Sequence, residues 1–177
     1  MNLPNFLTIL RIILAPLVFV ALYFGGIWTA VGTAIFAIGA LTDWMDGFLA
    51  RRNKQVTGFG QFTDPVADKL LSGFALAAVS MAGFVPILPV IGIILRDVLI
   101  TTFRLWGMSK DVKILPSRLA KAKTGIELLT LFVIMFYASF GGEPEGFWFG
   151  GVSIWIVFAL AWITLADYFW KNRNILI

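Results

Sequence analysis

The chain has 177 residues, of which 59% are hydrophobic and 14% are charged, and its mean hydropathy is +0.89. This composition excludes an ordinary soluble domain and predicts an integral membrane protein with room for about six spans of ~20 residues. Cysteine and histidine are absent, so disulfides, thiolate ligands and the usual general base are excluded. The net charge of +4 does not indicate a nucleic-acid partner, because the basic residues are sorted between alternate connections.

Apolar segments of helical length follow one another along the chain, separated by glycine-rich or charged turns. We expect a single all-α membrane domain over residues 1–177, with six transmembrane helices at 8–24, 29–50, 63–82, 87–107, 122–140 and 147–169. Ahead of these spans, residues 2–10 predict a short interfacial helix that begins near Pro4. Asn5, Thr8 and Arg11 recur every three residues and share its polar face, toward the headgroups or the site.

Lysine and arginine lie on alternate connections and in the carboxyl tail. The second connection carries Arg51, Arg52 and Lys54, whereas the first, third and fifth carry neither residue type. The fourth connection and the tail carry Lys110, Lys113, Arg118, Lys121, Lys123, Lys171 and Arg173. The positive-inside rule therefore places both termini in the cytoplasm.

Four aspartates fall on the cytoplasmic halves of the second and third spans. Asp43 and Asp46 are three residues apart and Asp64 and Asp68 are four apart, so each pair shares a helical face. Two facing carboxylate pairs repel one another unless cations lie between them, and an all-oxygen ligand set favours Mg²⁺, Mn²⁺ or Ca²⁺. Four carboxylates match the charge of two divalent ions, an arrangement that suits displacement at phosphorus. Without histidine, one carboxylate must also be the base if a hydroxyl is the nucleophile.

Other interpretations of the aspartates stay open at this point. They could pair with Arg51, Arg52 and Lys69 in a network at the helix ends, or mark the ion path of a cation- or proton-coupled transporter. An intramembrane prenyltransferase also binds Mg²⁺ and diphosphate through aspartate motifs, although its motifs are expected far apart in a longer chain.

The spacing of these residues resembles the signature of a known family. The run is Asp43-x2-Asp46-Gly47-x2-Ala50-Arg51-x8-Gly60-x3-Asp64-x3-Asp68, and every fixed position matches the CDP-alcohol phosphatidyltransferases. The resemblance covers essentially the whole chain. It implies a magnesium-dependent membrane enzyme, expected to be a homodimer, that displaces CMP from a CDP-linked lipid with an alcohol. It also implies that Asp43, Asp46 and Asp64 ligate metal, and that Asp68 ligates or lies beside one metal and acts as the base. Gly47, Ala50, Arg51 and Gly60 would shape the nucleotide and diphosphate pocket.

Within the family, the chain most resembles members that use CDP-diacylglycerol and sn-glycerol 3-phosphate. The opening residues 2–11, the pair Arg96-Asp97 and the block 120–127 carry this similarity, with Ala120 in place of glycine and Glu127 in place of glutamine. Inositol phosphate, phosphatidylglycerol and serine remain alternative acceptors.

Basic residues near the cytoplasmic ends of the fourth and fifth spans favour a phosphorylated acceptor. A free guanidinium at the depth of Arg96 is costly, so it either binds a ligand phosphate or pairs with Asp97 or the aspartates. The predicted acceptor-phosphate residues are Arg96, Arg104, Arg118, Lys121 and Lys123. Lys121 and Lys123 cannot share one helical face, so only one of them is expected to point inward. The site would face the cytoplasm from a bacterial-type inner or plasma membrane.

Overall fold

The computed structural model describes residues 3–53, 58–110 and 118–173, without the side chains of 3–5, 43–53, 58–62, 108, 118 and 146. Over these residues the fold is all-helical. The elements are α1 (Leu3–Phe24), α2 (Ile27–Asn53), α3 (Gly58–Met81), α4 (Ile87–Ser109), α5 (Arg118–Ser139), the 3₁₀ helix η1 (Pro144–Gly146) and α6 (Trp148–Lys171). Each of the six predicted spans corresponds to one α-helix, so the helical part of the prediction is confirmed.

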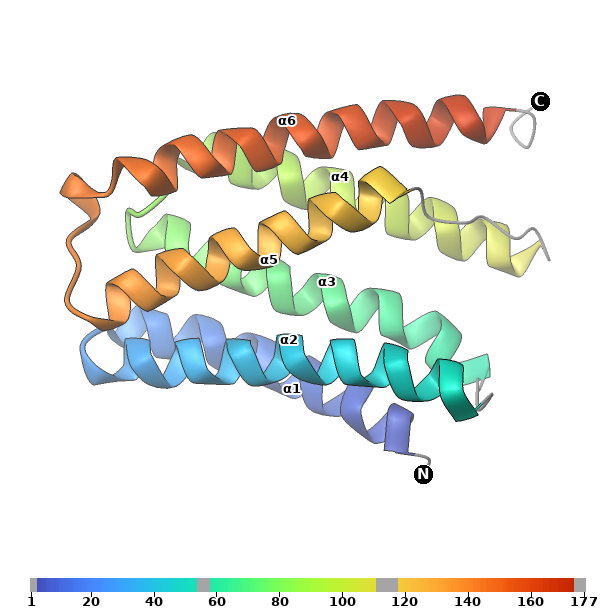
Figure 1. The fold of residues 1–177 in the computed structure, drawn as a ribbon, viewed down its shortest axis with the longest axis horizontal. Coiled ribbons are helices and arrows are strands. Elements are labelled where there is room, and N and C mark those ends of the chain that lie inside the picture. The colour runs from blue at the N-terminus through green and yellow to red at the C-terminus, as the bar shows by residue number, and fades with distance from the viewer. Residues whose placement is uncertain (1–2, 54–57, 111–117, 174–177) are drawn as a thin grey trace.

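The helices run alternately in opposite directions along one bundle axis (Figure 1). Both chain ends lie at the same end of the bundle as the end of α2, the start of α3, the end of α4 and the start of α5. Helix α1 packs against α2 and α3, α5 packs against α2, α3 and α6, and α4 packs against α3 and α6. Asp64 and Asp68 of α3, Arg104 of α4 and Lys121 of α5 therefore lie in the halves of their helices that point to one end of the molecule.

The predicted separate amino-terminal helix is wrong. Helix α1 continues without a break from Leu3 to Phe24, and Pro16 lies inside it. Its early turns belong to the bundle, since Thr8 and Arg11 are buried rather than turned toward an interface. Packing along α2 and α3 holds these turns in line with the rest of the helix, which local sequence signals could not show.

Apolar side chains fill the interior and also cover much of the outside. The core joins all six helices through residues such as Val18, Phe36, Leu71, Ile93 and Ile134, with Val157 contributed by α6. Large apolar side chains are also exposed along α1, α2, α4, α5 and α6, as expected for a surface that faces lipid. This is an all-α membrane protein.

Within the described residues, two helical segments are long and apolar enough to cross a membrane, Phe6–Phe24 and Trp148–Lys171. A shorter apolar helix covers Ile27–Thr42. Helices α3, α4 and α5 have lower hydropathy because they carry charged residues in their middle turns, and those charges form the site described below.

Glycines determine one helix approach and one tight turn. At Gly92 of α4, an added Cβ would lie 2.3 Å from the Phe158 ring of α6, so only a residue without a side chain allows this packing distance. Gly25 and Gly26 adopt φ values of 67° and 58° in the turn between α1 and α2, a conformation that favours glycine.

A polar contact joins α2 to α5. Thr33 of α2 donates a 3.1 Å hydrogen bond to the Met135 carbonyl of α5.

Candidate active site

The amino-terminal half of α3 carries an acidic face. Asp64 and Asp68 are one helical turn apart and are both partly buried. The Thr8 hydroxyl of α1 donates a hydrogen bond to Asp64 Oδ1, so α1 fixes one carboxylate of this face. The sequence placed Thr8 on a polar face of the first helix, and the structure shows that this face meets Asp64.

The other predicted members of the motif lie on the same pair of neighbouring helices. Asp43, Asp46, Gly47, Ala50 and Arg51 are in the carboxyl-terminal half of α2, and Gly60 is in the first turn of α3. Their side chains lie outside the described part of the structure. Among the described side chains, no three carboxylates come together as a ready metal cluster, since half of the predicted ligand set falls outside them.

A buried ionic cluster follows the acidic face toward the centre of the bundle. Its centre is the Asp97 carboxylate of α4, which Lys69 of α3 approaches to 3.2 Å and Lys123 of α5 to 3.1 Å. Arg96 donates to Asp97 Oδ1 through Nη1 at 2.7 Å. Lys123 also donates to Glu127 Oε2 at 2.7 Å. We call these five residues the Asp97 cluster; it ties α3, α4 and α5 together.

Helix α6 supplies the remaining partners of Arg96. Its Nε donates to the Ala161 carbonyl at 3.1 Å, and its Nη2 donates to the Thr164 hydroxyl at 2.6 Å. The guanidinium is thus held at all three nitrogens. The sequence predicted that a guanidinium at this depth needs a partner, either a ligand phosphate or a carboxylate. In the structure the partner is the Asp97 carboxylate.

The predicted acceptor residues separate into buried and accessible members. Arg96 and Lys123 are buried within the Asp97 cluster, Arg104 is half-buried, and Lys121 is exposed. The prediction that only one of Lys121 and Lys123 points inward is therefore confirmed. The side chain of Arg118 lies outside the described residues.

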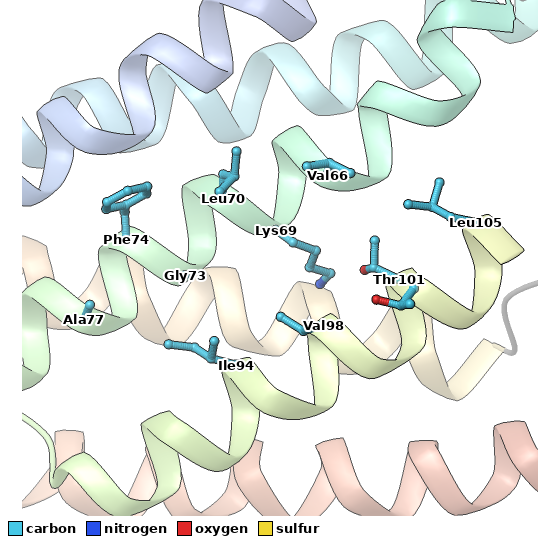
Figure 2. Close-up of a pocket in the computed structure, with 11 residues that line it drawn as sticks. Val66, Lys69, Leu70, Gly73, Phe74, Ala77, Ile94, Val98, Thr101 and Leu105 are labelled. Atoms are coloured by element: carbon cyan, nitrogen blue, oxygen red, sulfur yellow. The ribbon is translucent and has the colours of Figure 1, made fainter.

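The Asp97 cluster is in contact with the acidic face. Lys69 Nζ lies 3.9 Å from Asp68 Oδ2 and 3.2 Å from Asp97 Oδ2, so one ammonium bridges the two carboxylates. Lys69 also borders a groove of about 460 Å³ between α3 and α4 (Figure 2). The groove lining is otherwise apolar or threonine, and includes Phe74, Val98 and Thr101.

Sequence reasoning missed the roles of Lys69, Asp97 and Glu127. The sequence offered Asp97 only as a possible partner of Arg96, Glu127 only as part of a similar segment, and Lys69 only as a partner at a helix end. One available signal was that Lys123 and Glu127 are four residues apart in a segment otherwise apolar enough to be buried. The convergence of α3, α4 and α5 on one point could not be read from the chain.

The sequence model of the CDP-alcohol phosphatidyltransferase family matches residues 1–166. The chain belongs to this family. The CDP-alcohol phosphatidyltransferases are enzymes, and they use divalent metal ions.

Curated members of the family are similar to the chain over nearly its full length. A Rickettsia felis protein is 33% identical over 173 residues, covering 95% of this chain and 93% of that protein. A Sodalis glossinidius protein is 37% identical and covers 98% of this chain and 96% of its own, and one from Yersinia enterocolitica is 34% identical with 97% coverage of both. All three carry the name CDP-diacylglycerol–glycerol-3-phosphate 3-phosphatidyltransferase.

The described residues are compatible with the metal requirement of the family. Asp64 and Asp68 offer carboxylate oxygens from one face of α3, and Thr8 orients one of them. Oxygen donors of this kind suit hard divalent cations such as Mg²⁺. The neighbouring helix α2 carries the two further aspartates of the motif.

Proposed function

We propose that the chain transfers a phosphatidyl group from CDP-diacylglycerol to sn-glycerol 3-phosphate, giving phosphatidylglycerophosphate and CMP. The activity would be that of a phosphatidylglycerophosphate synthase, a step of phospholipid biosynthesis. The observation that carries the proposal is the similarity, over more than 90% of both chains, to relatives that bear the name of this activity.

Each residue of the aspartate motif has a proposed task. Asp43, Asp46, Asp64 and Asp68 would hold two Mg²⁺ ions, with Mn²⁺ as an alternative, and bound ions of this kind neutralise diphosphate charge. Gly47, Ala50, Arg51 and Gly60 would form the pocket for the cytidine nucleotide and its diphosphate. The complete motif spacing and the shared face of Asp64 and Asp68 support this assignment.

Asp68 is the proposed general base. It would accept the proton of the acceptor hydroxyl, whose oxygen then attacks the phosphorus on the lipid side of the diphosphate while CMP leaves. The partial exposure of Asp68 supports this choice, because a base must reach the acceptor. Lys69, 3.9 Å away, provides a positive charge beside the carboxylate as the proton moves.

The acceptor phosphate would bind to the basic residues of α4 and α5. Arg104 and Lys121 are the described members with accessible surface, and Arg118 begins α5 at the same end of the bundle. Arg96 and Lys123 belong to the same group but reach the acceptor through the charge of the Asp97 cluster. Arginine suits this task because its planar guanidinium binds phosphate in a bidentate manner.

We propose six transmembrane helices, both termini in the cytoplasm, and a site that opens to the cytoplasm from a bacterial inner or plasma membrane. The alternating helix directions and the basic residues at one end of the bundle support this topology. The acyl chains of the donor would enter from the inner leaflet. A homodimer is proposed from the family resemblance.

The test is conversion of labelled glycerol 3-phosphate by the purified protein in micelles that contain CDP-diacylglycerol and Mg²⁺. We expect a labelled lipid product and an equal amount of CMP, both lost in Asp68→Asn. Inositol phosphate, phosphatidylglycerol and serine are tested in parallel. A preference for one of these acceptors would reassign the substrate, and absence of CMP release with every acceptor would refute phosphatidyl transfer and leave a transporter to be tested by ion flux.

A further inference from the structure

Lys123 and Glu127 form an ion pair inside the bundle, one turn apart on α5. The Lys123 ammonium is 2.7 Å from Glu127 Oε2, and both side chains are 1% exposed. Lys123 is also held by Asp97, whose two carboxylate oxygens lie 3.1 Å and 3.2 Å from its Nζ. One buried ammonium is therefore shared by two carboxylates.

The second carboxylate has both a cost and a benefit for stability. Asp97 already supplies Lys123 with an anionic partner, and Glu127 Oε1 has no hydrogen-bond partner among the described residues although it is buried. A buried carboxylate oxygen without a donor lowers stability. The charge of Glu127 compensates part of the positive charge of the neighbouring buried cations, so its removal would affect both the stability of the bundle and the charge near the proposed site.

Glu127 determines the net charge of the Asp97 cluster. The cluster contains three cations, Lys69, Arg96 and Lys123, and two carboxylates, Asp97 and Glu127. Its net charge is therefore one positive, and it would be two positive without the charge of Glu127. In an interior of low dielectric constant, the electrostatic effect of such a difference in charge reaches beyond the side chains in direct contact.

The charge of the cluster reaches the proposed site through Lys69. Its ammonium lies 3.2 Å from Asp97 and 3.9 Å from Asp68, the proposed base. An acceptor phosphate that brings its hydroxyl to Asp68 therefore binds within the field of the cluster. The phosphate is attracted by the excess positive charge, and Glu127 reduces that charge.

We propose that Glu127 is a specificity-determining positioning residue: it holds Lys123 on Asp97 and limits the positive charge that attracts an anionic, phosphorylated acceptor. Glu127 does not touch the acceptor. It acts through Lys123 and the Asp97 cluster, and it sets the acceptor KM. This inference rests on the proposed function and concerns the same site.

The experiment compares four purified variants with the parent in micelles, measuring kcat and the separate KM values for glycerol 3-phosphate and CDP-diacylglycerol. Glu127→Gln keeps the shape of the side chain and removes its charge. Lys123→Met removes the cation, and the double variant Lys123→Met with Glu127→Gln removes both charges. Glu145→Gln is the matched control, because it removes an exposed carboxylate from η1 at the other end of the bundle.

We expect Glu127→Gln to lower the KM for glycerol 3-phosphate about fivefold, as one added positive charge near a dianion should. Lys123→Met should raise that KM by a similar factor, and the double variant should reverse most of the rise. The KM for CDP-diacylglycerol should change less than about twofold in each variant, since the motif aspartates and their ions compensate the diphosphate charge. Glu145→Gln should match the parent.

An unchanged or higher acceptor KM in Glu127→Gln would overturn the proposal, as would equal shifts in both substrates' KM values. A purely structural role predicts a lower kcat and melting temperature without a selective KM change. If Glu127→Gln does not fold, the KM for glycerol 3-phosphate is compared between Lys123→Met and the double variant, and an equal KM in the two overturns the proposal. Failure of all three variants to fold refutes a charge-setting role. If the parent itself makes no lipid from glycerol 3-phosphate, the proposed function fails instead.

Discussion

The substitution Asp97→Asn tests how strongly the Asp97 cluster holds the bundle together. Asparagine keeps the size of the side chain but removes the charge that three cations approach, at 2.7 Å for Arg96, 3.1 Å for Lys123 and 3.2 Å for Lys69. The asparagine amide also places hydrogen-bond donors where the carboxylate accepts them. The variant therefore leaves buried positive charges without their common counter-ion.

The expected loss of stability in Asp97→Asn follows from the burial of the side chains that pair with Asp97. Asp97, Arg96 and Lys123 are all buried, so water cannot replace the missing carboxylate. Removal of one partner from a buried ion pair costs about 3–5 kcal/mol. For a chain of this size about 1 kcal/mol shifts the melting temperature by roughly 2–4 °C, so the expected fall is about 6–20 °C.

Tryptophan fluorescence during heating in detergent micelles measures this shift. Asp167→Asn is the matched control, because Asp167 pairs at 2.8 Å with a Lys171 whose side chain is 58% exposed, and such pairs contribute about 0–1 kcal/mol. We expect the control to melt within about 4 °C of the parent. If Asp97→Asn melted at the temperature of the control, the Asp97 cluster would not stabilise the fold.

Three further predictions concern packing, the acidic face and the metal. Gly92→Ala should destabilise the protein by about 1–3 kcal/mol, because its Cβ would lie 2.3 Å from the Phe158 ring. Gly73→Ala is the control and should raise the melting temperature slightly, because an added Cβ there meets nothing within 4 Å. Equal shifts of the melting temperature in the two variants would contradict the packing argument. Thr8→Val removes the hydroxyl that orients Asp64. In a Mg²⁺ titration of activity, this variant should need an about tenfold higher Mg²⁺ concentration for half-maximal activity. An unchanged titration curve would mean that the contact between Thr8 and Asp64 is unrelated to metal binding. Chelation by EDTA should abolish CMP release and added Mg²⁺ should restore it, whereas activity that survives EDTA would exclude a divalent-ion requirement.

The helices were predictable from sequence because each carries an unambiguous local signal. Apolar runs of helical length end at glycine pairs or charged segments, and Gly25 and Gly26 form a turn where the sequence placed one. The boundary that failed, the separate helix at residues 2–10, depended on packing instead. No local signal indicates that Thr8 would meet Asp64, 56 residues later in the chain.

The candidate site was predictable only in its acidic half. Regular spacing placed Asp64 and Asp68 on one face, because a helix brings residues four apart together. The basic half depends on which helices are neighbours. Arg96 and Lys123 look like equivalent phosphate ligands in the sequence. In the structure both pair with the Asp97 carboxylate, and Lys123 also pairs with Glu127, so both cations already have partners.

The ion pairs of the Asp97 cluster also constrain how the chain can enter a bilayer during biosynthesis. Insertion of one Asp, Lys or Arg at the centre of a lone helix costs about 2.5–3.5 kcal/mol. Helices α3, α4 and α5 each carry such a residue, and the charges are matched only when the three helices meet. These helices should therefore leave the translocation machinery as a group, after synthesis of α5, with α6 closing over Arg96 last.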